Sequence, residues 1–158
     1  MVEEEHPPAN RDKFTQRDAQ ESDAPALAEL LGQFGYPASD ADTARRLGEL
    51  IHEPATRVIV ATRGEQIFGV GAVHSMRVLE GDSPLGVIIA LVVDSSVRLQ
   101  GVGASIVEAL EAEARSRDCF AIVVHSGRKR IESHQFYQHL GYEKTGARLL
   151  KVFGATSG

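Results

Sequence analysis

The chain has 158 residues, of which 42% are hydrophobic and 25% are charged. These values are typical of a globular protein and exclude a disordered or fibrous class, and the length fits one domain. The formal net charge of −5 disfavours a general nucleic-acid binder and is compatible with a cationic substrate. No apolar run approaches the roughly 20 residues of a membrane span, so no membrane partner is expected.

Two features of the sequence predict a cytoplasmic protein. Cys119 is the only cysteine, which prevents an intramolecular disulfide. The first residues include three glutamates, whereas a secretory signal begins with basic residues. We expect residues 1–13 to form a disordered tail, residues 14–153 a single domain, and residues 154–158 a second loose tail.

The first half of the chain predicts a strand, two helices and a hairpin. In chain order these are a strand at 14–17, a helix between Asp23 and Gly35, a helix from Ser39 to Glu53, and strands at 57–61 and 66–76. Ser22 or Asp23 is expected to cap the first helix and Ser39 the second. Gly69 and Gly71 indicate a bulge in the second hairpin strand.

The second half predicts alternating strands and helices. They are a strand at 86–93, a helix from about Ala104 to Arg117, a strand at 119–124, a helix at 132–139 and a terminal strand at 147–153. The strand at 86–93 is a near-continuous apolar run, typical of a strand covered on both faces. Opposite charges at Glu111–Arg115 and Glu113–Arg117 predict a solvated face of the long helix. The order of elements predicts an α+β fold.

The turn between the strand at 86–93 and the long helix lacks the acidic residues that usually begin a helix. No acid occurs between Val97 and Ser105, while Arg98 adds a cation, and Gly101 and Gly103 allow a close backbone approach. The free N–H groups of a helix start attract negative charge. The stretch therefore predicts an anion site, typically for phosphate.

The spacing Arg98-x-x-Gly101-x-Gly103 after a buried strand resembles the pyrophosphate-binding motif of the GNAT superfamily of acyl-CoA-dependent N-acyltransferases. A plain tight turn is an alternative for this motif alone. A dinucleotide-binding fingerprint would require an acid at the end of the next strand, and that strand ends at His125 instead.

A second motif lies at the correct distance, with one helix and one strand between the two. Its matching positions, in order, are Ser133, Phe136, Tyr137, Gly141 and Tyr142. Phe136 is interpreted as a core residue. The resemblance implies the GNAT fold, a mixed and mostly antiparallel sheet with flanking helices, in which the strands at 86–93 and 119–124 splay apart.

The resemblance also implies that acetyl-CoA is the acyl donor and that its pantetheine arm pairs with the strand edge at residues 91–93. The implied cofactor-binding residues are Leu91, Val92, Val93, Arg98, Leu99, Gln100, Gly101, Val102, Gly103, Ala104, Ser126, Arg130 and Tyr137. A backbone N–H near Leu91 or Val92 would polarise the thioester carbonyl. Tyr137 is the implied catalytic acid for the departing thiolate, and no metal site is expected.

The general base is where the sequence departs from the commoner family pattern. Many members have Glu one residue before this Leu-Val-Val segment, and this chain has Ala90. His74, His125, Glu80 and Asp82 are the candidates, each with an ordinary structural alternative.

The expected activity is acetyl transfer to a small primary amine by direct attack in a ternary complex. The run from Ser126 to Arg130 loosely resembles acetyltransferases that act on aminoalkylphosphonates or aminoglycosides. A protein N-acetyltransferase and a non-catalytic acyl-CoA-binding module are the alternatives. The sequence allows a homodimer without indicating one.

Overall fold

The computed structural model describes residues 13–125 and 131–154. The chain divides into two compact units, one ending at Val124 and the other beginning at His125, and each is described by itself. The single domain at 14–153 stays a prediction. No helix among the described residues is long and apolar enough to cross a membrane.

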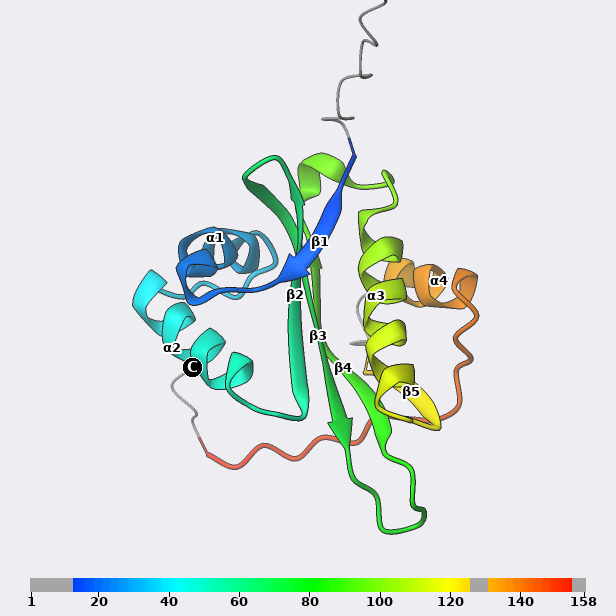
Figure 1. Ribbon diagram of the computed structural model, residues 1–158. Coiled ribbons are helices and arrows are strands. Elements are labelled where there is room, and N and C mark those ends of the chain that lie inside the picture. Colours follow the sequence, from blue (N-terminus) through cyan, green and yellow to red (C-terminus); the bar gives the residue numbers. More distant parts are fainter. Residues whose placement is uncertain (1–12, 126–130, 155–158) are drawn as a thin grey trace, which may run out of the picture. The chain divides into compact units, whose positions relative to one another are not determined.

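The first unit contains a five-stranded sheet with the strand order β1-β2-β3-β4-β5 (Figure 1). Its elements are β1 (Thr15–Asp18), α1 (Ala24–Gln33), α2 (Asp40–Ile51), β2 (Thr56–Arg63), β3 (Gln66–Met76), β4 (Leu85–Val93), α3 (Val102–Ser116) and β5 (Ala121–Val124), with short 3-10 turns η1 (Glu21–Asp23) and η2 (Ser95–Val97). All neighbouring strands are antiparallel except β4 and β5, which are parallel. The predicted α+β class and mixed sheet are confirmed.

The ends of the first two helices follow the sequence signals with one exception. Ser39 accepts a hydrogen bond from the Asp42 N–H at 3.0 Å, as a capping residue does. Gly35, just beyond α1, has a φ of +83°, which glycine adopts without strain. The expected side-chain cap at Asp23 is wrong, because its carboxylate accepts hydrogen bonds from the Arg17 guanidinium and the Gln20 N–H instead.

The sheet is covered by α1 and α2 on one face and by α3 on the other (Figure 1). On the first face, residues of α1 and α2 such as Leu27, Leu30 and Leu47 pack with residues of β2, β3 and β4. On the second face, Ile106 and Leu110 of α3 are fully buried. The apolar stripes that the sequence predicts for these helices therefore form the core on the two faces of the sheet.

The glycines of β3 mark the close approach of α3. A Cβ at Gly71 would collide with Ile106 Cγ2, and one at Gly69 would lie 2.8 Å from Ile106 Cδ1. Gly69 also flanks a register shift against β2, where Ala61 pairs with Gly69 and Thr62 with Ile67. The bulge expected here is present, and helix packing is the second reason for the glycines.

A second bulge lies in β4 at Ile89. Ala72 pairs with Ala90 and Val73 with Ile88, so Ile89 is left without a partner on β3. Because neighbouring residues of β3 face opposite sides, Ile88 and Ala90 also lie on opposite faces. Side chains beyond the bulge therefore lie on the sheet face opposite to the one that they would occupy in a strand without the bulge.

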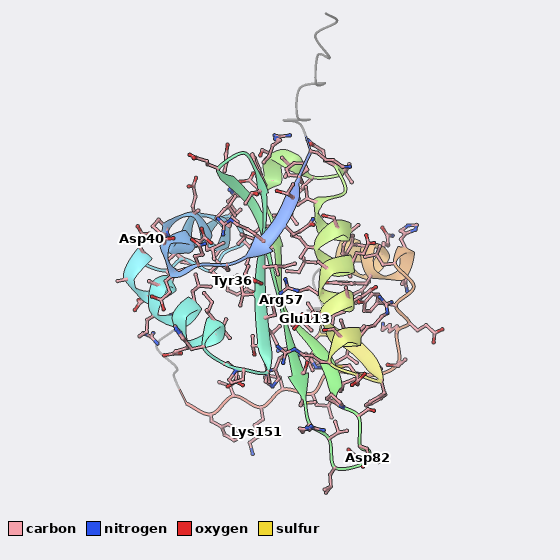
Figure 2. All side chains as sticks on the ribbon, in the orientation of Figure 1. Tyr36, Asp40, Arg57, Asp82, Glu113 and Lys151 are labelled. Carbon is pink, nitrogen blue, oxygen red and sulfur yellow. The ribbon has the colours of Figure 1, made fainter. Side chains whose placement is uncertain are left out.

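Part of the α3 face predicted to be solvated is half-buried instead. Glu113 binds Arg117 (Nε–Oε1 2.7 Å) as expected, but it also binds Arg57 of β2 (Nη1–Oε2 3.1 Å; Figure 2). Its side chain is only 15% exposed. Arg57 binds Asp18 as well, so this cluster ties α3 to β1 and β2.

The second unit contains α4 (Ile131–His139), which is followed by Gly141 at a φ of +90°. The terminal strand predicted at 147–153 is wrong, because no strand is assigned there. Four apolar side chains of this segment are exposed: Leu149, Leu150, Val152 and Phe153. An alternating apolar pattern forms a strand only where a neighbouring strand supplies hydrogen bonds.

We expect Gly71→Ala to lower the free energy of unfolding by about 1–3 kcal/mol, because the new methyl group collides with Ile106 near its backbone. Gly32→Ala is the matched control, since a Cβ at this position in α1 meets nothing within 4 Å. The control should gain about 0.5–1 kcal/mol from helix propensity. Urea unfolding measures both, and an unchanged midpoint for Gly71→Ala would contradict the predicted collision.

Candidate active site at the end of β4

The outer half of β4 has an open edge. The ladder between β4 and β5 ends where Ile88 pairs with Val124, and no strand of the described chain pairs with this edge from Ile89 to Val93. The splay predicted for these two strands is confirmed. An extended ligand with amide groups can therefore pair with β4 as an added strand would.

The hydrogen-bond pattern shows which residues present backbone groups at this edge. The Asp94 N–H donates to the Phe68 carbonyl of β3 at 2.7 Å. Because antiparallel pairs alternate, Val92 also bonds toward β3, whereas Leu91 and Val93 point their N–H and C=O groups to the open edge. Of the two predicted oxyanion donors, Leu91 therefore has its N–H at the open edge and Val92 does not; the role itself stays a prediction.

The turn after β4 is held by the last residue of α1, a contact that the sequence did not reveal. Asp94 accepts hydrogen bonds from Ser96 N–H at 2.8 Å and Ser96 Oγ at 2.6 Å. Gln33 donates to Asp94 Oδ2 at 3.2 Å and accepts from the Ser95 N–H at 3.2 Å. The hydrogen bonds from Ser96 and Gln33 lower the pKa of Asp94.

The loop from Arg98 to Gly101 has an unusual backbone. Leu99 has a φ of +65° and a fully exposed side chain, and Gly101 has a φ of +80°. A Cβ at Gly101 would meet nothing within 4 Å, so space remains beside it. The Arg98 guanidinium lies over the Phe34 ring at 5.7 Å, which adds a second link to the end of α1.

The start of α3 fits the predicted phosphate site. Gly101 is the N-cap without a side-chain hydrogen bond, and the first turn contains no acid. The first N–H groups of the helix therefore have neither a capping side chain nor an acid beside them, and the helix dipole favours an anion here. Val102 is only 2% exposed and packs in the core, so it can offer a ligand only its backbone.

Tyr137 lies on α4 in the second unit and is 8% exposed. Its ring contacts Phe136 and Tyr142 at centroid distances of 5.0 and 5.4 Å. Burial raises the pKa of Tyr137 to about 12, so the phenol is protonated at neutral pH. It can therefore donate a proton. Ser126 and Arg130 lie outside the described residues.

The candidates for the general base differ in their surroundings. Glu80 and Asp82 lie in the exposed loop between β3 and β4, where Figure 2 labels Asp82. Leu91 is six residues beyond the first residue of β4, roughly 20 Å at the rise of a strand, so both acids are too distant. His125 is exposed and belongs to the second unit, whereas His74 is half-buried on β3.

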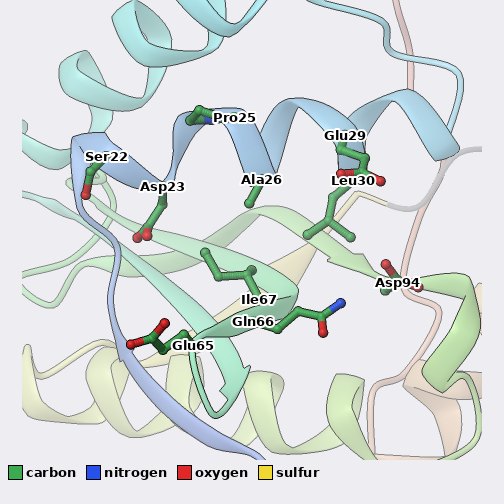
Figure 3. Close-up of a pocket in the computed structure, with 10 residues that line it drawn as sticks. All are labelled: Ser22, Asp23, Pro25, Ala26, Glu29, Leu30, Glu65, Gln66, Ile67 and Asp94. Atoms are coloured by element: carbon green, nitrogen blue, oxygen red, sulfur yellow. The ribbon is translucent and has the colours of Figure 1, made fainter.

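A pocket of about 340 Å³ lies between α1 and the β2–β3 turn, and Asp94 is one of the residues that line it (Figure 3). Four of its lining residues are acidic: Asp23, Glu29, Glu65 and Asp94. Such a hollow repels phosphate, and it contains none of the predicted cofactor-binding residues. Among the residues that the structure describes, no group of three or more His, Cys, Asp and Glu could hold a metal ion.

Comparison with known proteins relates this geometry to one family. Residues 24–142 match the model of the family described as acetyltransferase (GNAT) family. A comparison with curated proteins found no match.

Solved structures share the fold at low sequence identity. A transcriptional regulator from Bacillus halodurans C-125 is 24% identical, with a TM-score of 0.82 over 89% of this chain and 100% of that one. Glucosamine-6-phosphate N-acetyltransferase from Arabidopsis thaliana is also 24% identical, with a TM-score of 0.76 over 90% and 100%. The aminoglycoside N-acetyltransferase AAC(6')-Iy in complex with CoA is 16% identical, with a TM-score of 0.79 over 90% and 96%.

We expect Gly101→Asp to weaken binding of coenzyme A at least about tenfold relative to Gly101→Asn. Asn and Asp have the same size and both tolerate a positive φ, so the comparison isolates the negative charge beside the helix start. Isothermal titration of both folded variants measures the ratio. Equal affinities would contradict the anion site.

We expect Gln33→Leu to weaken coenzyme A binding about three- to tenfold, because the Asp94–Ser96 turn loses hydrogen bonds that each contribute about 0.5–1.5 kcal/mol. Leu keeps the helix propensity of α1. Gln138→Leu, at an exposed position of α4, is the control for a surface glutamine. An unchanged dissociation constant for Gln33→Leu would show that the turn holds its shape without α1.

Proposed function

Because the chain belongs to the GNAT family of acetyltransferases, we propose that it transfers the acetyl group of acetyl-CoA to a small primary amine. Membership of the family makes the protein an N-acetyltransferase; the donor, the acceptor class and the residues that act are the proposal. Acetyl-CoA supplies the thioester from which the acetyl group is transferred.

The observation that carries the proposal is the continuity of two backbone features. The open edge of β4 presents Leu91 and Val93, and the chain then leads through the Asp94–Ser96 turn to the acid-free start of α3. An acyl-CoA has amides in its pantetheine arm and a diphosphate beyond them. The strand edge can form hydrogen bonds with the pantetheine amides, and the N–H groups of the helix start can bind the diphosphate.

Leu91 and Tyr137 are assigned to the chemical step. The Leu91 N–H, at the open edge, stabilises the negative charge that develops on the thioester oxygen. The Tyr137 phenol, which burial keeps protonated at neutral pH, gives its proton to the departing thiolate. As the new C–N bond forms, the C–S bond breaks, and the proton that the neutral amine loses replaces the one that Tyr137 has given up, so the products are the amide and the free thiol of coenzyme A.

The position of Cys119 supports direct attack by the amine over a cysteine-bound intermediate. Its Sγ lies 3.7 Å from Ser75 Oγ, and the neighbouring Phe120 N–H donates to the Pro84 carbonyl at 3.0 Å. These contacts place Cys119 beside the first residues of β4, at the opposite end of the strand from Leu91. In the proposed reaction the acetyl group is therefore never bound to Cys119.

Similar structures suggest which acceptors to test. The names of two of them specify glucosamine-6-phosphate and aminoglycosides as acceptors for those proteins. The negative net charge of this chain is compatible with a cationic acceptor. We therefore propose an amino sugar or a similar small amine.

Isothermal titration with acetyl-CoA, followed by a thiol-release assay over a panel of amines, tests the function. The panel holds amino sugars, aminoglycosides, an aminoalkylphosphonate and a lysine-containing peptide. Turnover with a small amine supports the proposal. Turnover restricted to the peptide would indicate a protein N-acetyltransferase, and binding without turnover would indicate an acyl-CoA-binding module; either result would overturn the proposal.

We expect Tyr137→Phe to lower kcat by a factor on the order of 10² while leaving the acetyl-CoA dissociation constant within about threefold. The ring and its contacts with Phe136 and Tyr142 remain, and only the proton donor is lost. Tyr142→Phe is the control, because it removes a phenol from the neighbouring ring. A Tyr137→Phe enzyme with full turnover would leave Tyr137 as a packing residue.

A further inference from the structure

A polar pair lies on the sheet face opposite α3. His74 of β3 pairs in register with Thr56 of β2, and its Nδ1 lies 2.8 Å from Thr56 Oγ1. His74 is half-buried and Thr56 is 7% exposed. A buried hydroxyl therefore holds one nitrogen of the imidazole and leaves Nε2 for another partner.

The register places His74 on the same face as Ala90. Ala72 packs in the core with α1 and α2, and His74 follows it by two residues on β3, so both face away from α3. Ala90 pairs with Ala72 and, because of the bulge at Ile89, shares its face. His74 therefore lies about 7 Å along the strand from Ala90, at two residues of roughly 3.4 Å each.

That separation is appropriate for a proton acceptor near the reacting amine. In the proposed function the thioester carbonyl is held at Leu91, which directly follows Ala90 and pairs with Gly71, three residues from His74 on β3. An imidazole accepts a proton directly or through one water. Ala90 itself has no group that can do so.

We propose that His74 is the general base of the reaction and that Thr56 positions it, an inference that rests on the proposed acetyltransferase function. The Nδ1–H donates to Thr56 Oγ1, which leaves the lone pair on Nε2. Nε2 takes a proton from the acceptor ammonium group, and the neutral amine then attacks the thioester. The proton later passes from Nε2 to water.

His74→Gln tests the assignment with two acceptors of nearly equal shape, ethylamine and 2,2,2-trifluoroethylamine. Ethylamine is protonated at pH 7 and needs a base, whereas the trifluoro compound is largely neutral. We expect kcat/KM for ethylamine to fall by a factor on the order of 10²–10⁴, with a much smaller fall for trifluoroethylamine. The acetyl-CoA dissociation constant should stay within about threefold, which also shows that the variant is folded.

Three further variants complete the experiment. His52→Gln is the matched control, because His52 is an exposed histidine at the end of α2 and should leave both rates unchanged. Thr56→Val should lower the ethylamine rate, and Thr56→Ser should restore it because the hydroxyl returns. His74→Ala should regain part of the ethylamine rate when imidazole is added.

The outcomes separate this inference from the function on which it rests. If the parent protein acetylates ethylamine and His74→Gln does so equally well, His74 is not the general base, and the proposed acetyltransferase function is unaffected. If His74→Gln slows both amines equally, His74 acts on binding or structure and the inference is also overturned. A parent that binds acetyl-CoA and acetylates no amine in either set would overturn the proposed function itself.

Discussion

The close approach of α3 to β3 is the constraint on which the site depends. Gly69 and Gly71 leave room for Ile106, and a Cβ at Gly69 would also lie 3.3 Å from the Val92 carbonyl and 3.4 Å from Val102 Cγ1. The first residue of α3 is thus held beside the end of β4. The packing of α3 on β3 therefore brings the N–H groups of the helix start close to the open strand edge.

The bulge at Ile89 lies at the point where β4 and β5 stop pairing. A bulge bends its strand and increases the twist, and the ladder with β5 ends at Ile88, directly before it. The same extra residue reverses the faces, so that Val92 fills the core beneath α1 and α2 while Leu91 faces α3. One inserted residue therefore sets which side chains of β4 face each layer, directly beyond the end of the ladder with β5.

Local features of the fold could be predicted from the sequence, and long-range ones could not. The Ser39 cap, the apolar stripe of α3 and the acid-free turn at 97–105 depend on neighbours in the chain, and the structure contains all three. The contact of Gln33 with Asp94 joins residues 61 positions apart, and no pattern in either segment indicates it. The strand prediction for residues 147–153 was wrong for the same reason, because the alternation of apolar residues does not show whether a partner strand is present. The roles of the site residues stay predictions.

The short turn η2 explains how an acid can lie close to the proposed phosphate site. Asp94 is the only acid between β4 and Glu108, and it caps η2, where its oxygens accept from Ser96 and Gln33. These bonds lower its pKa and hold the carboxylate toward η2 and α1. Gly101 then begins α3 with no acid in its first turn. The Asp94 carboxylate thus caps the first of two consecutive helix starts, and the second, which has no acidic residue, is the one to which we assign an external anion.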